Sequence, residues 1–126
     1  MIASGRLTEH TAPRLVAIGV AKGVNLGFPD VAELANETLA LMSLDAEVAA
    51  ADVEVDPDWL GDDYAAPTDA ATAAIDWAAT TGGWLMNPVY SGKGLSGMLG
   101  HIDQGRWNSD DDVVFIHTGG WPALFA

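Results

Sequence analysis

The sequence predicts an α/β fold, namely an open, mainly parallel sheet with flanking helices. The main observation is that short apolar runs rich in β-branched residues alternate with longer segments whose apolar residues recur at helical spacing. A second observation is that 126 residues, of which 49% are hydrophobic, suffice for one domain with a modest core. Open α/β sheets of this kind bind their ligands outside the carboxyl ends of the strands.

The first half of the chain supplies two predicted strands and one helix. The run RLVAIGVA (14–21) is short, apolar and rich in β-branched residues, which predicts a buried strand. A helix follows over 28–42, where apolar residues recur at helical spacing, and Asp30 with Glu33 has the spacing of a capping box. The alternating stretch DVEVD (52–56) predicts a second, short strand.

The second half supplies two more helices and a final strand. The segment DAATAAIDWAATTGG (69–83) predicts a helix with Thr68 as its N-cap and the glycine pair at its end. The apolar spacing over 95–102 predicts another helix, which Gly105 closes. The run DVVFIH (112–117) reads as a buried strand that the following TGG ends at its carboxyl side.

The composition excludes several classes of partner. A formal net charge of -13, from 18 acidic and 5 basic residues, repels phosphate backbones and anionic lipids, so we expect no nucleic-acid and no membrane binding. The chain has no cysteine, which excludes disulfides and thiolate metal sites. Residues 1–13 lack the apolar core of a signal peptide, and no apolar run reaches membrane-spanning length. We expect a cytoplasmic protein.

The three histidines predict no metal site, because their spacing matches no ligand pattern. His101 falls outside the apolar face of the helix around it, so we expect it to be exposed. His117 ends the last predicted strand, where a hydrogen-bonded structural histidine is the more common case and a catalytic one the alternative.

Two stretches rich in glycine and hydroxyl groups are the candidate functional loops. They are NPVYSGKGLSGM (87–98) and FIHTGGWPALFA (115–126), and neither reads as an ordinary helix or strand. The first is not a nucleotide phosphate loop, because Asn87 stands where that motif needs glycine and Gly94 where it needs Ser or Thr.

These stretches, extended to LMNPVYSGKGLSGM and VVFIHTGGWPALFA, resemble the C-terminal part of the D-cysteine desulfhydrase and aminocyclopropane-carboxylate deaminase family. That family consists of pyridoxal-phosphate enzymes of the tryptophan-synthase β type. The resemblance covers residues 14–126 and leaves 1–13 unmatched. It implies that the fold is part of the large domain of a fold-type II pyridoxal-phosphate enzyme, and that the ligands are this cofactor and a small amino-acid substrate.

The resemblance also implies roles for four residues. Tyr90 would stack on the cofactor ring, and the hydroxyls of Ser91 and Thr118 would meet the pyridine nitrogen, with Gly119 in the cofactor-binding loop. Tyr90 and Ser91 would thus be the catalytic residues of this part. The alternative is that Ser91 and Thr118 only cap the adjoining helix or turn.

The hydroxyl pair also separates the two activities of the family. Deaminase-like members resemble YEG with HLGG, whereas desulfhydrase-like members resemble Y(T/S)G with HTGG, as here. A hydroxyl makes the ring a weaker electron sink than a carboxylate does, which suffices when a thiolate leaves. The pattern therefore favours a carbon–sulfur lyase acting on D-cysteine or a related amino acid, and deaminase activity stays the alternative.

The resemblance also identifies what the chain does not match. Neither Lys22 nor Lys93 stands in a GGNK-like segment, so no residue corresponds to the Schiff-base lysine, and the glycine-rich phosphate cradle is unmatched. The family's aspartate before PVY is Asn87 here. We expect a C-terminal fragment that needs a second chain for activity. The alternative assembly is a homodimer. The alternative functions are a non-catalytic remnant that binds a partner chain, and an autonomous small domain.

Overall fold

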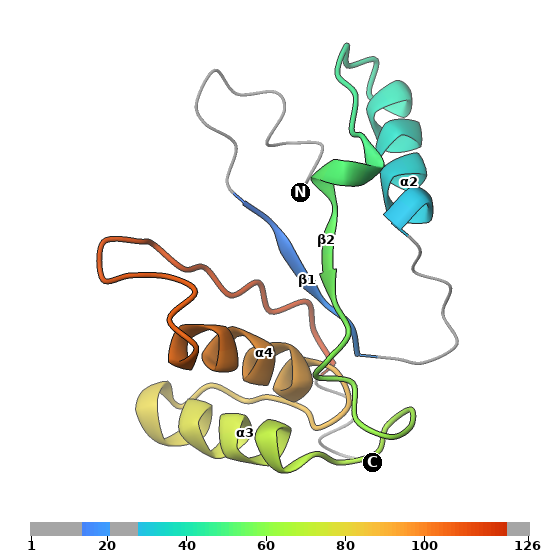
Figure 1. The fold of residues 1–126 in the computed structure, drawn as a ribbon. Helices are drawn as coiled ribbons and strands as arrows, with labels where there is room; N and C mark the ends of the chain where they lie inside the picture. Colours follow the sequence, from blue (N-terminus) through green and yellow to red (C-terminus); the bar gives the residue numbers. More distant parts are fainter. Residues whose placement is uncertain (1–13, 21–27, 121–126) are drawn as a thin grey trace. The chain divides into compact units, whose positions relative to one another are not determined.

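The computed structural model describes residues 14–20 and 28–120 of the chain (Figure 1). The elements, in chain order, are strand β1 (Val16–Ile18), helix α2 (Phe28–Leu41), the 3-10 helix η1 (Ala50–Asp52), strand β2 (Glu54–Asp56), helix α3 (Asp69–Gly82) and helix α4 (Ser91–Asp103). Strands β1 and β2 are neighbours in a small, open, parallel sheet. The predicted α/β class is therefore confirmed.

The described residues divide into two compact units, 14–17 with 28–56 and 18–20 with 57–120. The predicted boundary at residue 13 and the end of the first predicted strand at residue 21 lie outside the described residues.

The first unit buries one face of α2 against the segment that leads into β2. Its buried core consists of Ala32, Leu39, Val48 and Val53. Asn36 fixes this packing, because its side-chain amide donates to the Val48 carbonyl at 2.9 Å and its oxygen accepts from the Val48 N–H at 2.8 Å. The paired bonds satisfy backbone groups that would otherwise be buried without partners.

Helix α2 begins earlier than the capping pattern predicts. Its first residue is Phe28, so Asp30 lies inside the first turn and not at the N-cap position that the pattern predicts. Pro29 explains the early start, because the first turn of a helix needs no backbone N–H and the fixed φ of proline suits it. The helix then ends at Leu41, close to the predicted end.

The second unit is built on α3 and α4, which lie side by side (Figure 1). The cap of α3 is confirmed, since the Thr68 hydroxyl accepts from the Ala71 N–H at 3.1 Å. Its predicted end is confirmed too, because Gly83 follows it with a left-handed φ of 66°. The core between the helices consists of Ala74, Ala78, Met86 and Leu95.

Helix α4 begins at Ser91, four residues before the predicted apolar spacing. Most of the first candidate loop is therefore helix, and the prediction that it is irregular is wrong. The glycines of this stretch make it read as a loop in the sequence. In the structure they lie in the helix, where they let neighbouring segments approach it closely. A methyl group on Gly92 would lie 2.9 Å from Ile75 Cδ1, and one on Gly97 would lie 2.8 Å from Ile18 Cδ1.

The segment 112–117 is not a strand, which corrects the prediction for DVVFIH. Val114 and Ile116 are 79% and 44% exposed, and within the described part of the chain no backbone–backbone hydrogen bond reaches this segment. A strand requires a neighbour, and the sheet that the structure describes contains only β1 and β2. The period-two pattern is present, since Phe115 and His117 are half-buried while Val114, Ile116 and Thr118 beside them are exposed.

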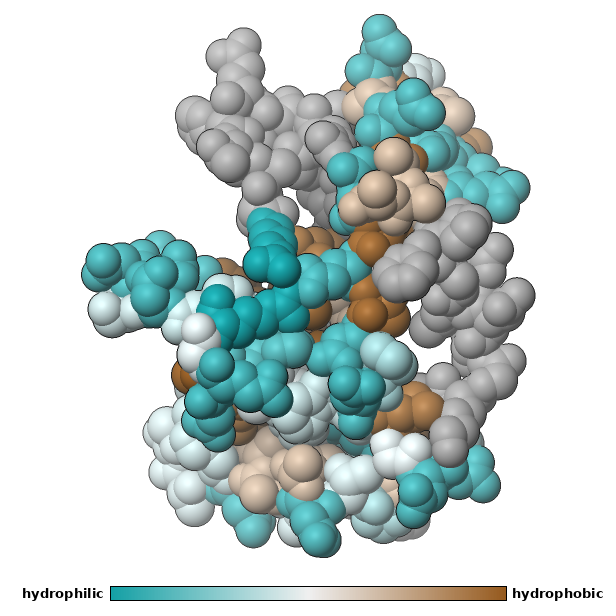
Figure 2. Space-filling model, viewed as in Figure 1, coloured by the Kyte–Doolittle hydropathy of each residue, from teal (hydrophilic) through white to brown (hydrophobic). Residues whose placement is uncertain are grey.

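The residues 108–112 between α4 and this segment are all exposed, and Figure 2 shows them as a hydrophilic projection. None of the helices in the described ranges is long and apolar enough to span a membrane.

Candidate functional site

The two candidate loops meet at Asn87 and Gly120. A methyl group built on Gly120 would lie 1.6 Å from Asn87 Nδ2, so only glycine fits beside the amide. Gly119 and Gly120 both have left-handed φ values, 112° and 96°, which the second loop needs in order to turn here. The structure thus brings together two stretches that lie about thirty residues apart.

Asn87 is fully buried and holds the first loop in shape. Its Oδ1 accepts from the N–H groups of Val89 and Tyr90 at 2.9 and 2.7 Å, which fixes the turn into α4. Its Nδ2 has no hydrogen-bond partner among the described residues. A buried amide without an acceptor costs about 1–3 kcal/mol, so this donor is a candidate contact for a bound molecule.

Ser91 is buried at the start of α4 beside Asn87. Its hydroxyl oxygen accepts from the Asn87 N–H at 2.8 Å, so it ties the turn together. This bond uses only the oxygen, and in the described ranges no group accepts the hydroxyl proton. Ser91 is not the N-cap of α4, a position that Tyr90 occupies without a capping hydrogen bond from its side chain.

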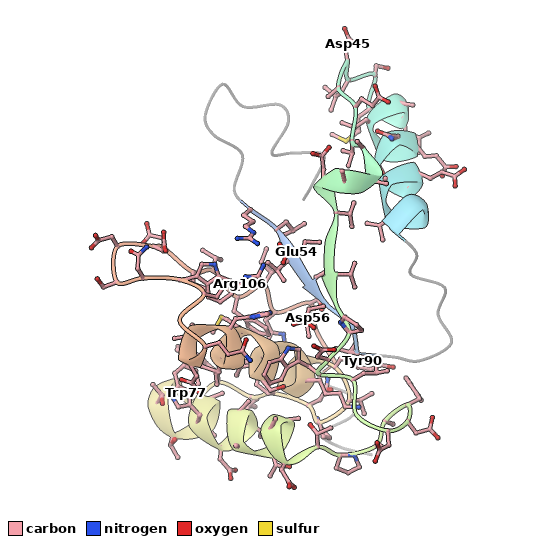
Figure 3. The ribbon with its side chains drawn as sticks, viewed as in Figure 1. Asp45, Glu54, Asp56, Trp77, Tyr90 and Arg106 are labelled. Atoms are coloured by element: carbon pink, nitrogen blue, oxygen red, sulfur yellow. The ribbon has the colours of Figure 1, made fainter. Side chains whose placement is uncertain are left out.

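Tyr90 lies at the amino end of α4 with 40% of its surface exposed (Figure 3). Its hydroxyl pairs with the hydroxyl of Tyr64, and the two rings are tilted by 58° with their centroids 6.3 Å apart. This hydrogen bond raises the pKa of Tyr90, and partial desolvation and the charge of an ionised Tyr64 raise it further.

Tyr64 is a candidate site residue that sequence reasoning missed. It lies in the irregular loop GDDYAAPT, where no periodicity distinguishes it. The one available signal is that Tyr64 and Tyr90 are the chain's two tyrosines.

Thr118 and His117 belong to the second loop. Thr118 is exposed, and its hydroxyl makes no hydrogen bond to any described residue. His117 Nδ1 accepts from the Gly119 N–H at 3.1 Å, so its Nε2 carries the proton and donates to the Leu85 carbonyl at 3.1 Å. The predicted hydrogen bonding of His117 is confirmed, although the residue does not end a strand, and its structural role stays a prediction.

His101 is buried, and the prediction that it is exposed is wrong. Its ring lies edge-on to Trp59 and Trp107, with centroid distances of 6.2 and 5.5 Å. Arg106, which follows α4, places its guanidinium 3.2 Å from His101 Nε2 (Figure 3). Residues outside α4 therefore bury His101, although the apolar pattern of the helix alone predicts that this side chain faces solvent.

Lys93 is fully buried and is not available as a free amine. Its Nζ donates to the Leu60 carbonyl at 2.6 Å. Within residues 14–20 and 28–120, no cluster of three histidine or carboxylate side chains forms a metal site.

No family model matches the chain. Over 120 residues, it is 37% identical to proteins named D-cysteine desulfhydrase from Salmonella newport, Salmonella heidelberg and Salmonella enteritidis PT4. The match covers 94% of this chain, which spans about a third (36%) of the length of these relatives. This is consistent with the C-terminal portion alone. The chain is thus similar, over nearly all of its length, to one part of D-cysteine desulfhydrase.

Proposed function

We propose that this chain is the cofactor-ring-contacting part of a pyridoxal-phosphate-dependent carbon–sulfur lyase. The reaction is a β-elimination that, with one water, converts D-cysteine or a related amino acid into pyruvate, ammonia and sulfide. The observation that carries the proposal is the meeting of Asn87 with Gly120, because it joins the two motifs that resemble the lyase family. The 37% identity to proteins named D-cysteine desulfhydrase supports the same conclusion.

The residues at this meeting point fit the ring of the cofactor. When bound, pyridoxal phosphate would withdraw electrons from the α-carbon of the substrate through its pyridine ring. A pyridine nitrogen is a hydrogen-bond acceptor, and the site offers two buried donors without a described acceptor, the Ser91 hydroxyl and Asn87 Nδ2. Gly119 borders open space, since a methyl group there would meet no atom within 4 Å, and this space is where a planar ring would lie.

The residues of this chain would bind and orient rather than carry the covalent step. Tyr90 would support the ring with its exposed aromatic face, and Ser91 would donate to the ring nitrogen. Thr118, whose hydroxyl is exposed, would be the second donor from the other loop. A neutral hydroxyl leaves the ring nitrogen unprotonated, which favours loss of a thiolate over deaminase chemistry.

Lys93 cannot supply the amine that would hold the cofactor covalently, because its Nζ is buried against Leu60. We therefore propose that the amine and the phosphate-binding segment come from a region corresponding to the unmatched two-thirds of the relatives. The second candidate function is partner binding without catalysis. The exposed apolar side chains of Val114 and Ile116 favour it, since a partner segment would cover them.

A chimera tests the proposed function. Residues 14–126 would replace the matching region of the Salmonella enzyme, and sulfide and pyruvate release from D-cysteine would be measured. We expect turnover, and we expect Ser91→Ala to lower kcat by at least about tenfold. Ser96→Ala is the matched control, because this serine lies in the same helix but bonds to the Lys93 carbonyl.

The outcomes separate the candidates. A folded chimera that binds pyridoxal phosphate but releases no sulfide would refute the lyase proposal. Ammonia release from aminocyclopropane-carboxylate instead would support the deaminase alternative. Failure to bind the cofactor at all, with the fold intact, would leave partner binding as the function of these surfaces.

A further inference from the structure

The buried ammonium of Lys93 is the least expected group of the second unit. Lysine is almost never fully buried, and an ammonium in the interior must be compensated by strong hydrogen bonds or charges. Lys93 lies in the first turn of α4 and donates from Nζ to the Leu60 carbonyl at 2.6 Å. This short, charge-assisted bond joins the helix to a loop that precedes it by about thirty residues.

The bonded carbonyl begins the part of the loop that carries Tyr64. Gly61 follows it with a left-handed φ of 78°, and a methyl group there would lie 2.7 Å from Thr68 Cγ2 and 3.8 Å from Lys93 Nζ. The loop therefore turns over the ammonium and returns to the cap of α3. Between these two fixed ends, the Asp63 carboxylate accepts the Tyr64 N–H at 2.7 Å.

The same turn of α4 contacts this loop at a second point. Tyr90 stands three residues before Lys93, and the Gly94 N–H donates to the Tyr90 carbonyl at 2.9 Å within that turn. Side chains three residues apart lie on one helix face. The Tyr90 hydroxyl and the Lys93 ammonium thus reach the same loop, one at Tyr64 and the other at Leu60.

We infer that Lys93 is a positioning residue, whose ammonium holds the Leu60 carbonyl and thereby places the Tyr64 hydroxyl against that of Tyr90. The tyrosine pair then has a fixed geometry without a bound molecule. That this geometry serves the cofactor ring rests on the proposed function, whereas the positioning itself does not.

Tyrosine ionisation measures the positioning directly in the full chain. Because Tyr64 and Tyr90 are the only tyrosines in the sequence, absorbance at 295 nm against pH reports on this pair alone. In the wild type, the hydrogen bond to Tyr64 raises the pKa of Tyr90. Tyr64→Phe removes that bond and leaves Tyr90 as the one tyrosine, so its single midpoint should lie below the upper midpoint of the wild type, and the difference is the reference shift.

Lys93→Met keeps the apolar stem and removes the ammonium. We expect its upper midpoint to fall as far as in Tyr64→Phe, and we expect Tyr64→Phe to add no further fall in the Lys93→Met background. Ser96→Ala is the matched control, since it removes a buried hydroxyl from α4 without touching the loop, and its titration should equal that of the wild type. Circular dichroism at each pH shows that the variants stay folded.

A folded Lys93→Met protein that titrates like the wild type would overturn the inference. If this variant does not fold, the titration of Gly61→Ala tests the inference instead. Its methyl group would collide with Thr68 Cγ2, so we expect the loop to shift at the neighbouring Leu60 carbonyl, while the sequence of α4 is unchanged. We expect the same fall in the upper midpoint, and a wild-type titration of folded Gly61→Ala would also overturn the inference. The titration needs no cofactor, so its failure is distinct from a failure of the chimera.

Discussion

Replacing Gly120 with alanine tests the contact between the two loops quantitatively. At φ 96° an alanine is strained by about 1–2 kcal/mol. Its methyl group would also lie 1.6 Å from Asn87 Nδ2, so the Asn87 side chain must move. That movement breaks its bonds from the N–H groups of Val89 and Tyr90, each of which contributes about 1 kcal/mol. We expect Gly120→Ala to lower the free energy of unfolding by about 3–4 kcal/mol in total.

A double-mutant cycle separates backbone strain from the collision. In an Asn87→Ala background the amide is gone, so Gly120→Ala should cost only the strain, about 1–2 kcal/mol. The coupling energy between the two positions should therefore be about 2 kcal/mol.

Urea unfolding followed by tryptophan fluorescence is the suitable assay. The four tryptophans in the described ranges, Trp59, Trp77, Trp84 and Trp107, all belong to the second unit, so their emission reports on the unit that contains both loops. The slope of the free energy against urea must stay constant for the comparison to hold. A coupling energy below about 0.5 kcal/mol would refute the reasoning, because sites without contact are additive within that margin.

Three further substitutions test the packing of the units. Thr68→Ala should cost about 1 kcal/mol of unfolding free energy by removing the α3 cap, which a thermal melt followed by circular dichroism would show. Leu95→Ala should cost about 3 kcal/mol in urea unfolding because this side chain fills the core between α3 and α4, and a loss below about 1 kcal/mol would contradict that packing. Arg14→Ala should lower the free energy of unfolding by less than about 1 kcal/mol, because its ion pair with Glu54 at 3.0 Å is exposed. Unfolding followed by circular dichroism would measure this change, and a larger loss would show that the Arg14 side chain stabilises the unit by more than an exposed ion pair does.

The features that the sequence predicts correctly depend on local interactions. The Thr68 hydroxyl bonds to a backbone N–H three residues away, and Gly83 ends the same helix through its own conformation. Neither requires knowledge of the rest of the chain. The two candidate loops that the resemblance assigns to one site also meet, through Asn87 and Gly120, whereas the roles assigned to Tyr90, Ser91 and Thr118 stay predictions.

The features that the sequence misses depend on distant segments. His101 is buried because Trp59 and Trp107 contact it from outside the helix, which the helical pattern does not contain. The run 112–117 has the period of a strand, but a strand also needs a neighbour. Tyr64 lies in a loop without periodicity, so only its hydroxyl contact with Tyr90 identifies it.

The glycines of α4 have a consequence for the order of folding. Gly92, Gly94, Gly97 and Gly100 each lower the intrinsic stability of the helix by about 1 kcal/mol relative to alanine. A methyl group on Gly100 would lie 1.9 Å from Trp59 Cη2, so the same residues that weaken the isolated helix admit its neighbours. An isolated α4 would therefore be mostly unwound, and it becomes helical only as those neighbours dock. We expect α4 to form late, with low φ-values in the folding transition state, after the alanine-rich α3.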